Sequence, residues 1–382
     1  MTRILLFLSL ALFQWSCNFE QKVTGSAEEE LKDILNPKYA KGFSAYRDAQ
    51  GMLILTVTNP WPHVTKPLKY ALIPKHLDSH NLNTADYDAV IRLPLRRLVL
   101  TSTTHIPSLE ALDELDILVG FPGLAYISSA AARQRIHLGK IEELGANEQL
   151  NVEKTIALQP DALIGFGISG APRSYQTLKA ANIPVIFNGD WMEQHPLGKA
   201  EWIKFYGLLL DKSEQANTIF STIETAYLEA QKLASSALTT PTVLSGALYR
   251  DIWYMPGGQS WGATFLKDAH AQYIWGATPE TGSLSLSLEA VLDKAHNADF
   301  WIAPSEYTSY QGMQQATSHY QQFKPFRERK IFSYAQTKGP SGGMLYFELG
   351  PARPDLVLKD LIYYLHPGLL TNYEPVFFKP LQ

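Results

Sequence analysis

Short apolar runs and amphipathic stretches alternate along most of the chain, after a start that is rich in β-type runs. Three runs near the start favour strands because β-branched and other apolar residues dominate them: 52–58, 70–73 and 89–93. Asn59 and Pro60 end the first of these runs. We therefore expect a small group of N-terminal strands before the main body of the protein.

From residue 97 onward, predicted strands and helices alternate in two blocks. In the first block, strands are expected at 97–100, 116–120, 162–165 and 183–187, and helices at 107–115, 152–158 and 174–181. In the second block, strands are expected at 242–248, 300–303 and 330–334, and helices at 261–269, 286–294 and 354–365. This alternation is typical of α/β domains with a mainly parallel sheet.

A long helical stretch separates the two blocks. Apolar residues keep helical spacing from Ala216 to Ala230, and Asp211 with Glu214 resembles a capping box at its start. The predicted fold class is α/β, with two Rossmann-like lobes, one long helix between them and a small N-terminal β extension. The expected segments are 18–94 for a tether and the β extension, 95–198 for the first lobe, 199–238 for linker helices, 239–370 for the second lobe and 371–382 for a tail.

The composition excludes several classes of protein. The chain has 382 residues, 46% of them apolar, and a net charge of only −4. Disordered chains have few apolar residues and a high net charge, so disorder is excluded for most of the chain. The net charge of −4, without a basic stripe, argues against nucleic-acid binding. The single cysteine, Cys17, cannot form an internal disulfide, and one cysteine excludes cysteine-based zinc sites and iron–sulfur clusters.

That cysteine closes a segment typical of a secretory signal. A positively charged start precedes an apolar run at 4–12 that is too short to span a bilayer, and the small residue Ser16 stands before Cys17. Cleavage before Cys17 and lipidation of its thiol would make a bacterial lipoprotein, although Gln14 and Trp15 depart from the usual motif. The alternative is a chance cysteine beside an ordinary secretory signal. We expect an exported protein, periplasmic or on the cell surface, that acyl chains anchor to a membrane.

Each α/β block contains one copy of a short helix–strand signature. Residues 151–164 and 287–302 both run from a cap residue through an apolar residue and a glutamate into a short helix, after which an aspartate leads into an apolar strand. The glutamates are Glu153 and Glu289. Each stands in the first turn of its predicted helix, where the helix dipole favours the ionised carboxylate. Chance similarity between two α/β units is the alternative explanation.

These stretches carry a family resemblance. The ordered set 96–121, 151–167, 178–187, 287–303 and 353–370, with the linker helix in its middle, resembles the substrate-binding proteins of ABC importers that capture ferric siderophores, haem or cobalamin. The resemblance extends over residues 95–370 and lies in the order and spacing of the motifs, since no single motif is specific. The early strands suggest a lipoprotein subgroup with an N-terminal extension.

The resemblance implies a monomeric binding protein rather than an enzyme, without a cofactor of its own. Its ligand would be an iron complex (a siderophore or haem) or cobalamin, held between the lobes, and its partner would be the membrane-embedded part of an ABC permease. In this family each lobe presents one glutamate to arginines of the permease. The residues at that motif position here are Glu153 and Glu289.

Candidate ligand residues lie in the loops that follow the predicted strands, because open α/β sheets bind ligands beyond the carboxyl ends of their strands. Aromatic side chains stack on flat ligands and arginines hold anionic complexes. For each aromatic residue the alternative is core packing, and for His105 it is a place at a helix start. Phe347 and Glu348 also stand in such a loop. The residues expected to contact the ligand are Thr104, His105, Tyr126, Arg133, Trp191, Trp253, Tyr254, Trp261, Tyr307 and Arg353.

Two motifs point to other functional classes. Residues 165–170 match the G-x-G-x-x-G fingerprint of a dinucleotide-binding oxidoreductase, and Asp190 follows at a suitable distance, but Pro172 stands where the Rossmann helix should already run. Residues 258–262 match the G-x-S-x-G nucleophile elbow, with Ser260 as the nucleophile. An exported serine hydrolase is therefore the main alternative, although glycines and a proline separate this motif from the preceding strand.

A third pattern concerns metal binding. His76 and His80 are four residues apart and could lie on one helix face as metal ligands. A third ligand at suitable spacing does not stand out, so two surface histidines are the better interpretation.

Overall fold

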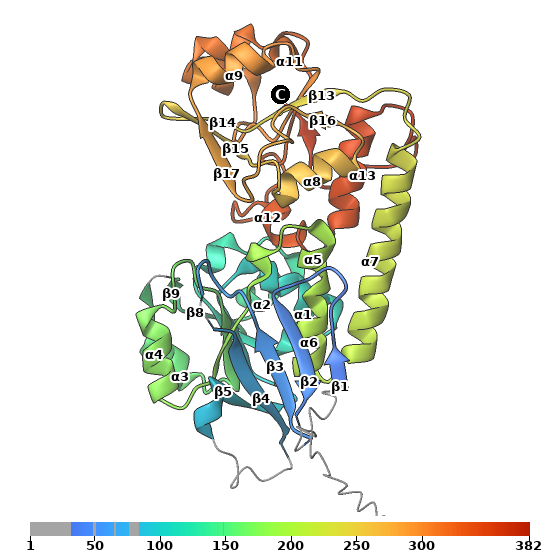
Figure 1. Cartoon of the computed structure of the whole chain (residues 1–382). Coiled ribbons are helices and arrows are strands. Elements are labelled where there is room, and N and C mark those ends of the chain that lie inside the picture. The colour runs from blue at the N-terminus through green and yellow to red at the C-terminus, as the bar shows by residue number, and fades with distance from the viewer. Residues whose placement is uncertain (1–31, 49–50, 65, 76–83, 148) are drawn as a thin grey trace, which may run out of the picture.

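The structure is a computed structural model that describes residues 32–48, 51–64, 66–75, 84–147 and 149–382 (Figure 1). Two α/β lobes lie one above the other, and helix α7 (Ser213–Ala234) runs along one side of the molecule between them. The 22 residues of α7 span about 33 Å. The predicted fold class is confirmed. Cys17, His76 and His80 lie outside the described residues.

The N-terminal lobe is built on a five-stranded parallel sheet in the order β12-β11-β6-β7-β8. Strands β6, β11 and β12 are fully buried short apolar runs, as expected for a parallel sheet with both faces covered. The strands are β6 (Leu98–Leu100), β7 (Leu118–Phe121), β8 (Glu142–Glu143), β11 (Ala162–Gly165) and β12 (Val185–Phe187). The helices are α1 (Ile106–Ala111), α2 (Ala130–His137), α3 (Val152–Ala157), α4 (Arg173–Ala180), α5 (Pro196–Glu201) and α6 (Ile203–Leu210), and β9 (Gly145–Ala146) pairs with β10 (Gln149–Leu150).

The early strands form a second sheet that packs on this lobe rather than a separate unit (Figure 1). Its strands follow in sequence order, and only the last pair, β4 with β5, is parallel. The Tyr70 hydroxyl accepts a hydrogen bond from the backbone N–H of Phe187 in β12 (3.0 Å), and Phe43 packs against Trp202. The strands are β1 (Lys32–Leu35), β2 (Phe43–Arg47), β3 (Leu53–Val57), β4 (Leu68–Pro74) and β5 (Ala89–Leu93).

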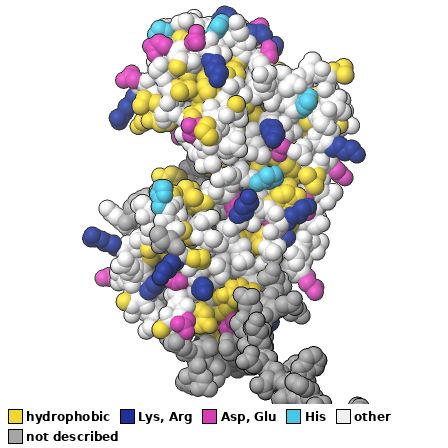
Figure 2. Space-filling model, in the orientation of Figure 1, with side chains coloured by type: hydrophobic (Ala, Val, Ile, Leu, Met, Phe, Trp, Pro, Cys, Tyr) yellow, Lys and Arg dark blue, Asp and Glu magenta, His cyan; other side chains and the backbone are white. Residues whose placement is uncertain are grey.

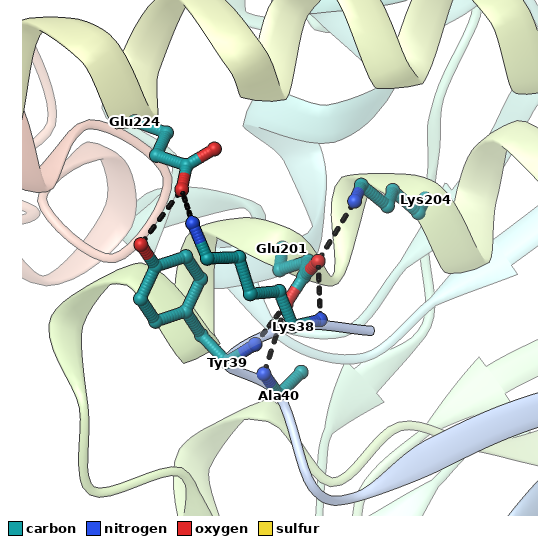
Figure 3. A network of polar contacts seen from close by, with 6 residues as sticks. All are labelled: Lys38, Tyr39, Ala40, Glu201, Lys204 and Glu224. Carbon is teal, nitrogen blue, oxygen red and sulfur yellow. Dashed lines mark hydrogen bonds and ion pairs between the residues drawn. The ribbon is translucent and has the colours of Figure 1, made fainter. Parts of the chain in front are cut away.

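A carboxylate network ties the segment between β1 and β2 to α5 and α7 (Figure 3). Glu201 is fully buried and accepts hydrogen bonds from the backbone N–H groups of Lys38, Tyr39 and Ala40 at 2.7–3.0 Å, and from Lys204 Nζ at 2.7 Å. The Lys38 ammonium and the Tyr39 hydroxyl both donate to Glu224 of α7. The N-terminal sheet is thus anchored at the point where the linker helix passes.

The start of α7 differs from the sequence prediction. Asp211 adopts a left-handed conformation (φ 62°) that ends α6, and Lys212 is the N-cap of α7 without a side-chain hydrogen bond to the helix. The expected capping box of Asp211 and Glu214 is therefore wrong. The tight turn between α6 and α7 demands a left-handed residue at the position where the box would need an extended one.

The C-terminal lobe repeats the plan with a sheet in the order β16-β13-β18-β19-β20, in which only the β19–β20 pair is antiparallel. The segment 371–382, expected as a tail, supplies β20 and so belongs to this lobe. The strands are β13 (Thr242–Ser245), β16 (Gln272–Tyr273), β18 (Phe300–Ile302), β19 (Ile331–Ser333) and β20 (Lys379–Pro380). The helices are α8 (Trp261–Asp268), α9 (Leu288–Ala295), α10 (Tyr310–Ala316), α11 (Lys324–Arg327), α12 (Leu345–Leu349) and α13 (Pro354–Leu365).

A three-stranded antiparallel sheet, β14-β15-β17, projects from this lobe beside the gap between the lobes (Figure 1). Its strands are β14 (Ala247–Tyr249), β15 (Ile252–Pro256) and β17 (Ser283–Leu286). The single strand predicted at 242–248 is split, because Gly246 turns the chain with φ 77°. A Cβ there would lie 1.9 Å from the carbonyl oxygen of Tyr254, so only glycine fits.

Within the described part of the chain, none of the helices combines the length and the apolar character that a membrane span requires.

Candidate functional site: an aromatic cleft between the lobes

A cleft of about 650 Å³ lies between the two lobes, on the side away from α7, where the surface in Figure 2 is notched. Residues that follow strands line it on both sides, as the rule for open α/β sheets predicts. The N-terminal lobe supplies four consecutive residues from the loop after β12, Trp191 to Gln194, together with Pro62. The main side chains of the C-terminal lobe are Tyr254, Met255, Trp261, Tyr334, Tyr346 and Phe347.

The C-terminal wall of the cleft is a continuous aromatic stack. The rings of Tyr334 and Tyr346 are nearly parallel, with centroids 4.7 Å apart and planes at 7°. Trp261 stacks on the other side of Tyr346 at 5.7 Å and 23°. Phe347 meets Tyr334 edge-on at 5.1 Å. Because each ring fixes its neighbour, this wall is ordered before any ligand arrives.

The N-terminal wall centres on Trp191, whose side chain is 39% exposed on the short 3₁₀ turn Asp190–Met192. The turn is held from below by Lys199, whose ammonium donates to the carbonyl oxygens of Asp190 (2.9 Å) and Trp191 (3.1 Å). The same ammonium lies 5.2 Å from the ring centroid of Trp261 in the opposite lobe. One buried cation thus contacts both aromatic walls.

The cleft is aromatic and nearly free of charge. Among the described residues that line it, Glu193 is the only acid, and lysine and arginine are absent. Glu193 Oε1 accepts hydrogen bonds from the backbone N–H groups of Lys41 and Gly42 and from Trp202 Nε1, so this oxygen is held by the protein. Burial raises the pKa of Glu193 despite these bonds. Burial also raises the pKa of Tyr334 to about 12, so its phenol stays protonated and can donate.

Three of the ten predicted ligand residues line the cleft: Trp191, Tyr254 and Trp261. Tyr254 and Trp253 are neighbours on β15, whose residues point alternately outward and inward. Tyr254 is 42% exposed, whereas Trp253 is fully buried, stacks on Trp301 and donates its Nε1–H to the carbonyl oxygen of Ser245. The expectation that Trp253 contacts ligand is therefore corrected: this residue is a core residue.

His105 also lies outside the cleft. It is the last residue of the 3₁₀ turn Thr103–His105, and its side chain is completely buried. Neither ring nitrogen has a hydrogen-bond partner within the described residues. Burial lowers its pKa, so the imidazole is neutral. Its position at the start of α1 matches the alternative interpretation of a helix-start residue.

The remaining predicted ligand residues are not among those that line the cleft. Thr104 shares a hydrogen bond with Ser102, and Tyr307 is half-buried against Tyr320. Arg133 donates to the carbonyl oxygen of Leu124, so its guanidinium serves the local loop. Tyr126 is 72% exposed.

Arg353 forms a bidentate ion pair with Asp355 and lines a different groove, between α1, α7 and α13. It is therefore not a contact of the inter-lobe cleft.

Sequence reasoning missed Tyr334, Tyr346 and Met192. Tyr334 follows the carboxyl end of β19, so the strand-end rule could have found it. Tyr346 stands on a five-residue helix whose existence the pattern did not predict. Phe347, in the segment before the last helix, lines the cleft.

The two signature glutamates occupy matching places. Glu153 and Glu289 are exposed in the first turns of α3 and α9, and the capping residues Asn151 and Ser287 accept hydrogen bonds from the third residue of each helix. The pKa of Glu289 is lowered by its own backbone N–H and by the Ser287 hydroxyl. Neither carboxylate belongs to an ion pair within the described residues, and the two helices lie far apart on different lobes (Figure 1).

The local geometry does not support the two enzyme alternatives. Helix α4 begins at Arg173 with Pro172 as its N-cap, three residues after the last glycine of the dinucleotide motif. Ser260 is the N-cap of α8: its hydroxyl donates to the carbonyl oxygen of Gly257 (2.7 Å) and accepts from Ala263 N–H (3.3 Å). The buried His366 lies at the far end of this helix, where its Nε2 forms a hydrogen bond of 2.7 Å with the carbonyl oxygen of Ala269.

Metal coordination by the protein alone is not indicated in the described part of the chain. Groups of three or more histidine, cysteine, aspartate or glutamate side chains suited to a metal ion do not occur there.

Comparison with known proteins agrees with this architecture. An uncharacterized lipoprotein of Methanocaldococcus jannaschii is 24% identical over 298 residues, which cover 76% of this chain and 69% of the relative. A periplasmic binding protein from Veillonella parvula shares the fold with a TM-score of 0.57 at 15% identity, over 88% of this chain and 98% of that one. A periplasmic heme-binding protein from Pseudomonas aeruginosa has a TM-score of 0.56 at 18% identity, over 75% and 98%.

The family match covers the parallel sheet of the N-terminal lobe, the helix between the lobes and the larger part of the C-terminal lobe. The model of the periplasmic binding protein family matches residues 98–336, which include the β6 strand at one end and the β19 strand with Tyr334 at the other. The two-lobed fold and the cleft between the lobes lie mainly within this range. The chain therefore belongs to the periplasmic binding protein family.

Proposed function

We propose that this protein is the substrate-binding component of an ABC importer. It captures an iron complex (haem or a ferric siderophore) or cobalamin in the cleft between its lobes, and it delivers that ligand to a membrane permease. The observation that carries this proposal is the aromatic cleft, in which Trp191 on one lobe faces the stack of Trp261, Tyr346 and Tyr334 on the other. Similarity to a heme-binding protein supports the ligand class.

The charge of the cleft narrows the ligand class further. Aromatic side chains stabilise flat or apolar ligands through dispersion and stacking. A strongly anionic complex would need arginine or lysine partners, and none is found among the described residues of the lining. We therefore favour ligands of low charge at the part that enters the cleft: the haem macrocycle with its propionates toward solvent, a ferric hydroxamate, or cobalamin.

A ligand screen tests this proposal. Purified protein is titrated with haemin, a ferric trihydroxamate, cyanocobalamin and a ferric tricatecholate, and both thermal unfolding and tryptophan fluorescence are followed. A true ligand at 100 times its dissociation constant stabilises the fold by about 2.7 kcal/mol and quenches Trp191 and Trp261. We expect one of the first three to bind and the trianionic tricatecholate not to bind. Failure of all four would refute the ligand class.

We propose further that Cys17 is lipidated, so that acyl chains hold the exported protein at a membrane, and that Glu153 and Glu289 dock on the permease. Two exposed carboxylates, one on each lobe, would orient the protein on a two-fold partner and speed the encounter. Metabolic labelling with a fatty acid, compared between the wild-type chain and Cys17→Ser, tests the anchor. Equal labelling of the two chains would overturn it.

Docking is tested by transport measurements. The double variant Glu153→Lys/Glu289→Lys should abolish uptake in cells that carry the cognate permease, while ligand affinity stays unchanged because both side chains lie outside the cleft. The matched control is Glu214→Lys/Glu229→Lys, which makes the same change in net charge at two exposed positions of α7. Normal uptake by the first variant would refute the docking assignment.

A further inference from the structure

Three consecutive residues of α12 point to two different parts of the molecule. Tyr346 and Phe347 line the ligand cleft, whereas Glu348 points into the N-terminal lobe and is only 2% exposed. In Figure 1, α12 lies at the junction of the two lobes. The helix that carries the aromatic wall therefore also carries a buried contact to the opposite lobe.

The Glu348 carboxylate accepts two hydrogen bonds across the lobe boundary. Its Oε2 accepts from the backbone N–H of Ser128 at 2.6 Å, and its Oε1 accepts from the backbone N–H of Ser129 at 2.7 Å. Ser129 is the N-cap of α2, so the carboxylate also lies at the positive end of a helix dipole. Charge-assisted bonds of this length are about twice as strong as neutral ones.

The backbone around this contact is packed as closely as glycine allows. A Cβ at Gly343 would lie 2.1 Å from the carbonyl oxygen of Tyr126, and a Cβ at Gly339 would lie 2.5 Å from Cα of Ser128. The Ser341 hydroxyl donates to the carbonyl oxygen of Ile127 at 3.3 Å. The loop 337–345 of the C-terminal lobe therefore rests on the segment 126–129 of the N-terminal lobe, main chain against main chain.

The position of this carboxylate is costly in free energy. Burial and the charge of Glu110, which itself accepts a hydrogen bond from the Ser129 hydroxyl, raise the pKa of Glu348 to about 7. Burying a charge costs several kcal/mol unless hydrogen bonds offset it. A glutamine or an apolar residue at position 348 would avoid the cost of burying a carboxylate. The presence of a glutamate there therefore indicates a role for its two hydrogen bonds across the lobe boundary.

We infer that Glu348 is a positioning residue that pins the two lobes together behind the cleft and so sets the separation between the Trp191 wall and the Trp261–Tyr346 wall. The linker helix α7 joins the lobes on one side, Lys199 contacts Trp261 at the cleft, and the Glu348 contact joins the lobes at a further point. Attachments separated in this way oppose the hinge motion that α7 alone would permit. The effect on ligand affinity rests on the proposed function, whereas the effect on lobe separation does not.

Distance measurements between the lobes test this inference without any ligand. Spin labels are placed on exposed positions of α4 and α9 through Gln176→Cys and Asp293→Cys, in the full chain with its only native cysteine changed by Cys17→Ser. Electron–electron double resonance then gives the distribution of lobe separations. We expect a narrow distribution with Glu348 and a broader, shifted one with Glu348→Ala.

A second buried carboxylate provides the matched control. Asp360 is fully buried and accepts hydrogen bonds from the backbone N–H groups of Val376, Phe377 and Phe378, all within the C-terminal lobe. Asp360→Asn should lower stability but keep the narrow distribution of lobe separations. If Glu348→Ala does not fold, Glu348→Gln, which retains the shape and one acceptor oxygen, takes its place and should broaden the distribution less.

Ligand affinity is the second readout, with haemin as the probe. Glu348→Ala should weaken haemin binding about tenfold, and Asp360→Asn should not. An unchanged distance distribution in both Glu348 variants, or equal broadening in Asp360→Asn, would overturn the inference. Absence of haemin binding to the wild-type protein would count against the proposed ligand and leave the distance result to decide the role of Glu348.

Discussion

The C-terminal lobe contributes a packed aromatic stack to the cleft, whereas the N-terminal lobe contributes one half-exposed tryptophan on a turn. Tyr346 is fixed on both faces, by Tyr334 and by Trp261. Trp191 depends on two hydrogen bonds from Lys199 to its turn. The difference indicates that the C-terminal wall is the preformed recognition surface and that the N-terminal wall adapts to what is bound.

The largest effect on binding is expected at the C-terminal wall. Trp261→Ala removes the ring that covers Tyr346 and should weaken haemin binding by about 2–3 kcal/mol, roughly 30- to 150-fold, as for a buried anchor residue. Fluorescence titration measures the affinity. Trp253→Phe is the control, because this tryptophan belongs to the same lobe but lies in the core. Equal losses in both variants would show that the stack has no special role.

A smaller effect is expected at the N-terminal wall. Trp191→Ala should weaken binding by about 1.4 kcal/mol, close to tenfold, with little change in unfolding temperature because the side chain is half-exposed. Tyr249→Ala, at an exposed aromatic residue that does not line the cleft, should leave affinity unchanged. If Trp191→Ala proves more damaging than Trp261→Ala, the assignment of the two walls must be reversed.

The contact between the lobes appears in a different quantity, the dependence of the free energy of unfolding on pH. The pKa of Glu348 is raised from 4.5 to about 7 in the folded protein, so between these values the folded state keeps a proton that the unfolded state releases. Stability therefore falls as the pH rises from 4.5 to 7, by at most ~1.4 kcal/mol per pH unit. This contribution is fully present only below the lower value.

Denaturant unfolding at a series of pH values measures this dependence. Glu193 and Asp360 also have raised pKa values and contribute in the same direction. The difference between the wild-type protein and Glu348→Gln isolates Glu348, because the other two carboxylates are common to both. A difference that does not vary between pH 4.5 and 7 would contradict the raised pKa.

Much of the fold follows from local sequence signals. Helices α3, α9 and α13 begin within two residues of the predicted positions, because capping residues or a proline mark their starts. Strands β6, β11, β12, β13 and β18 of the two main sheets coincide with short, mostly buried apolar runs. Two local predictions were wrong. Asp211 ends α6 where a capping box was expected, and Gly246 divides the strand predicted at 242–248.

The candidate site was predictable only in part, since the sequence shows which loops follow strands but not which side chains of a loop face the cleft. Trp191 and Trp261 follow that rule. Tyr346 was missed because a five-residue helix leaves no periodic pattern to recognise. Arg353, an expected ligand contact, is instead paired with Asp355 two residues away.

The sequence by itself determined the order of elements, the two related lobes and the exposed glutamates at the starts of α3 and α9. The tertiary structure alone decided between Trp253 and Tyr254. Both are aromatic neighbours on β15, and alternation along a strand requires that one face the core and the other the cleft. Which one does so depends on the packing of this strand against Trp301 and Phe323, far away in sequence. The same holds for Glu348, whose partners lie 219 and 220 residues away. Only folding brings such groups together, because long-range packing and burial set their roles.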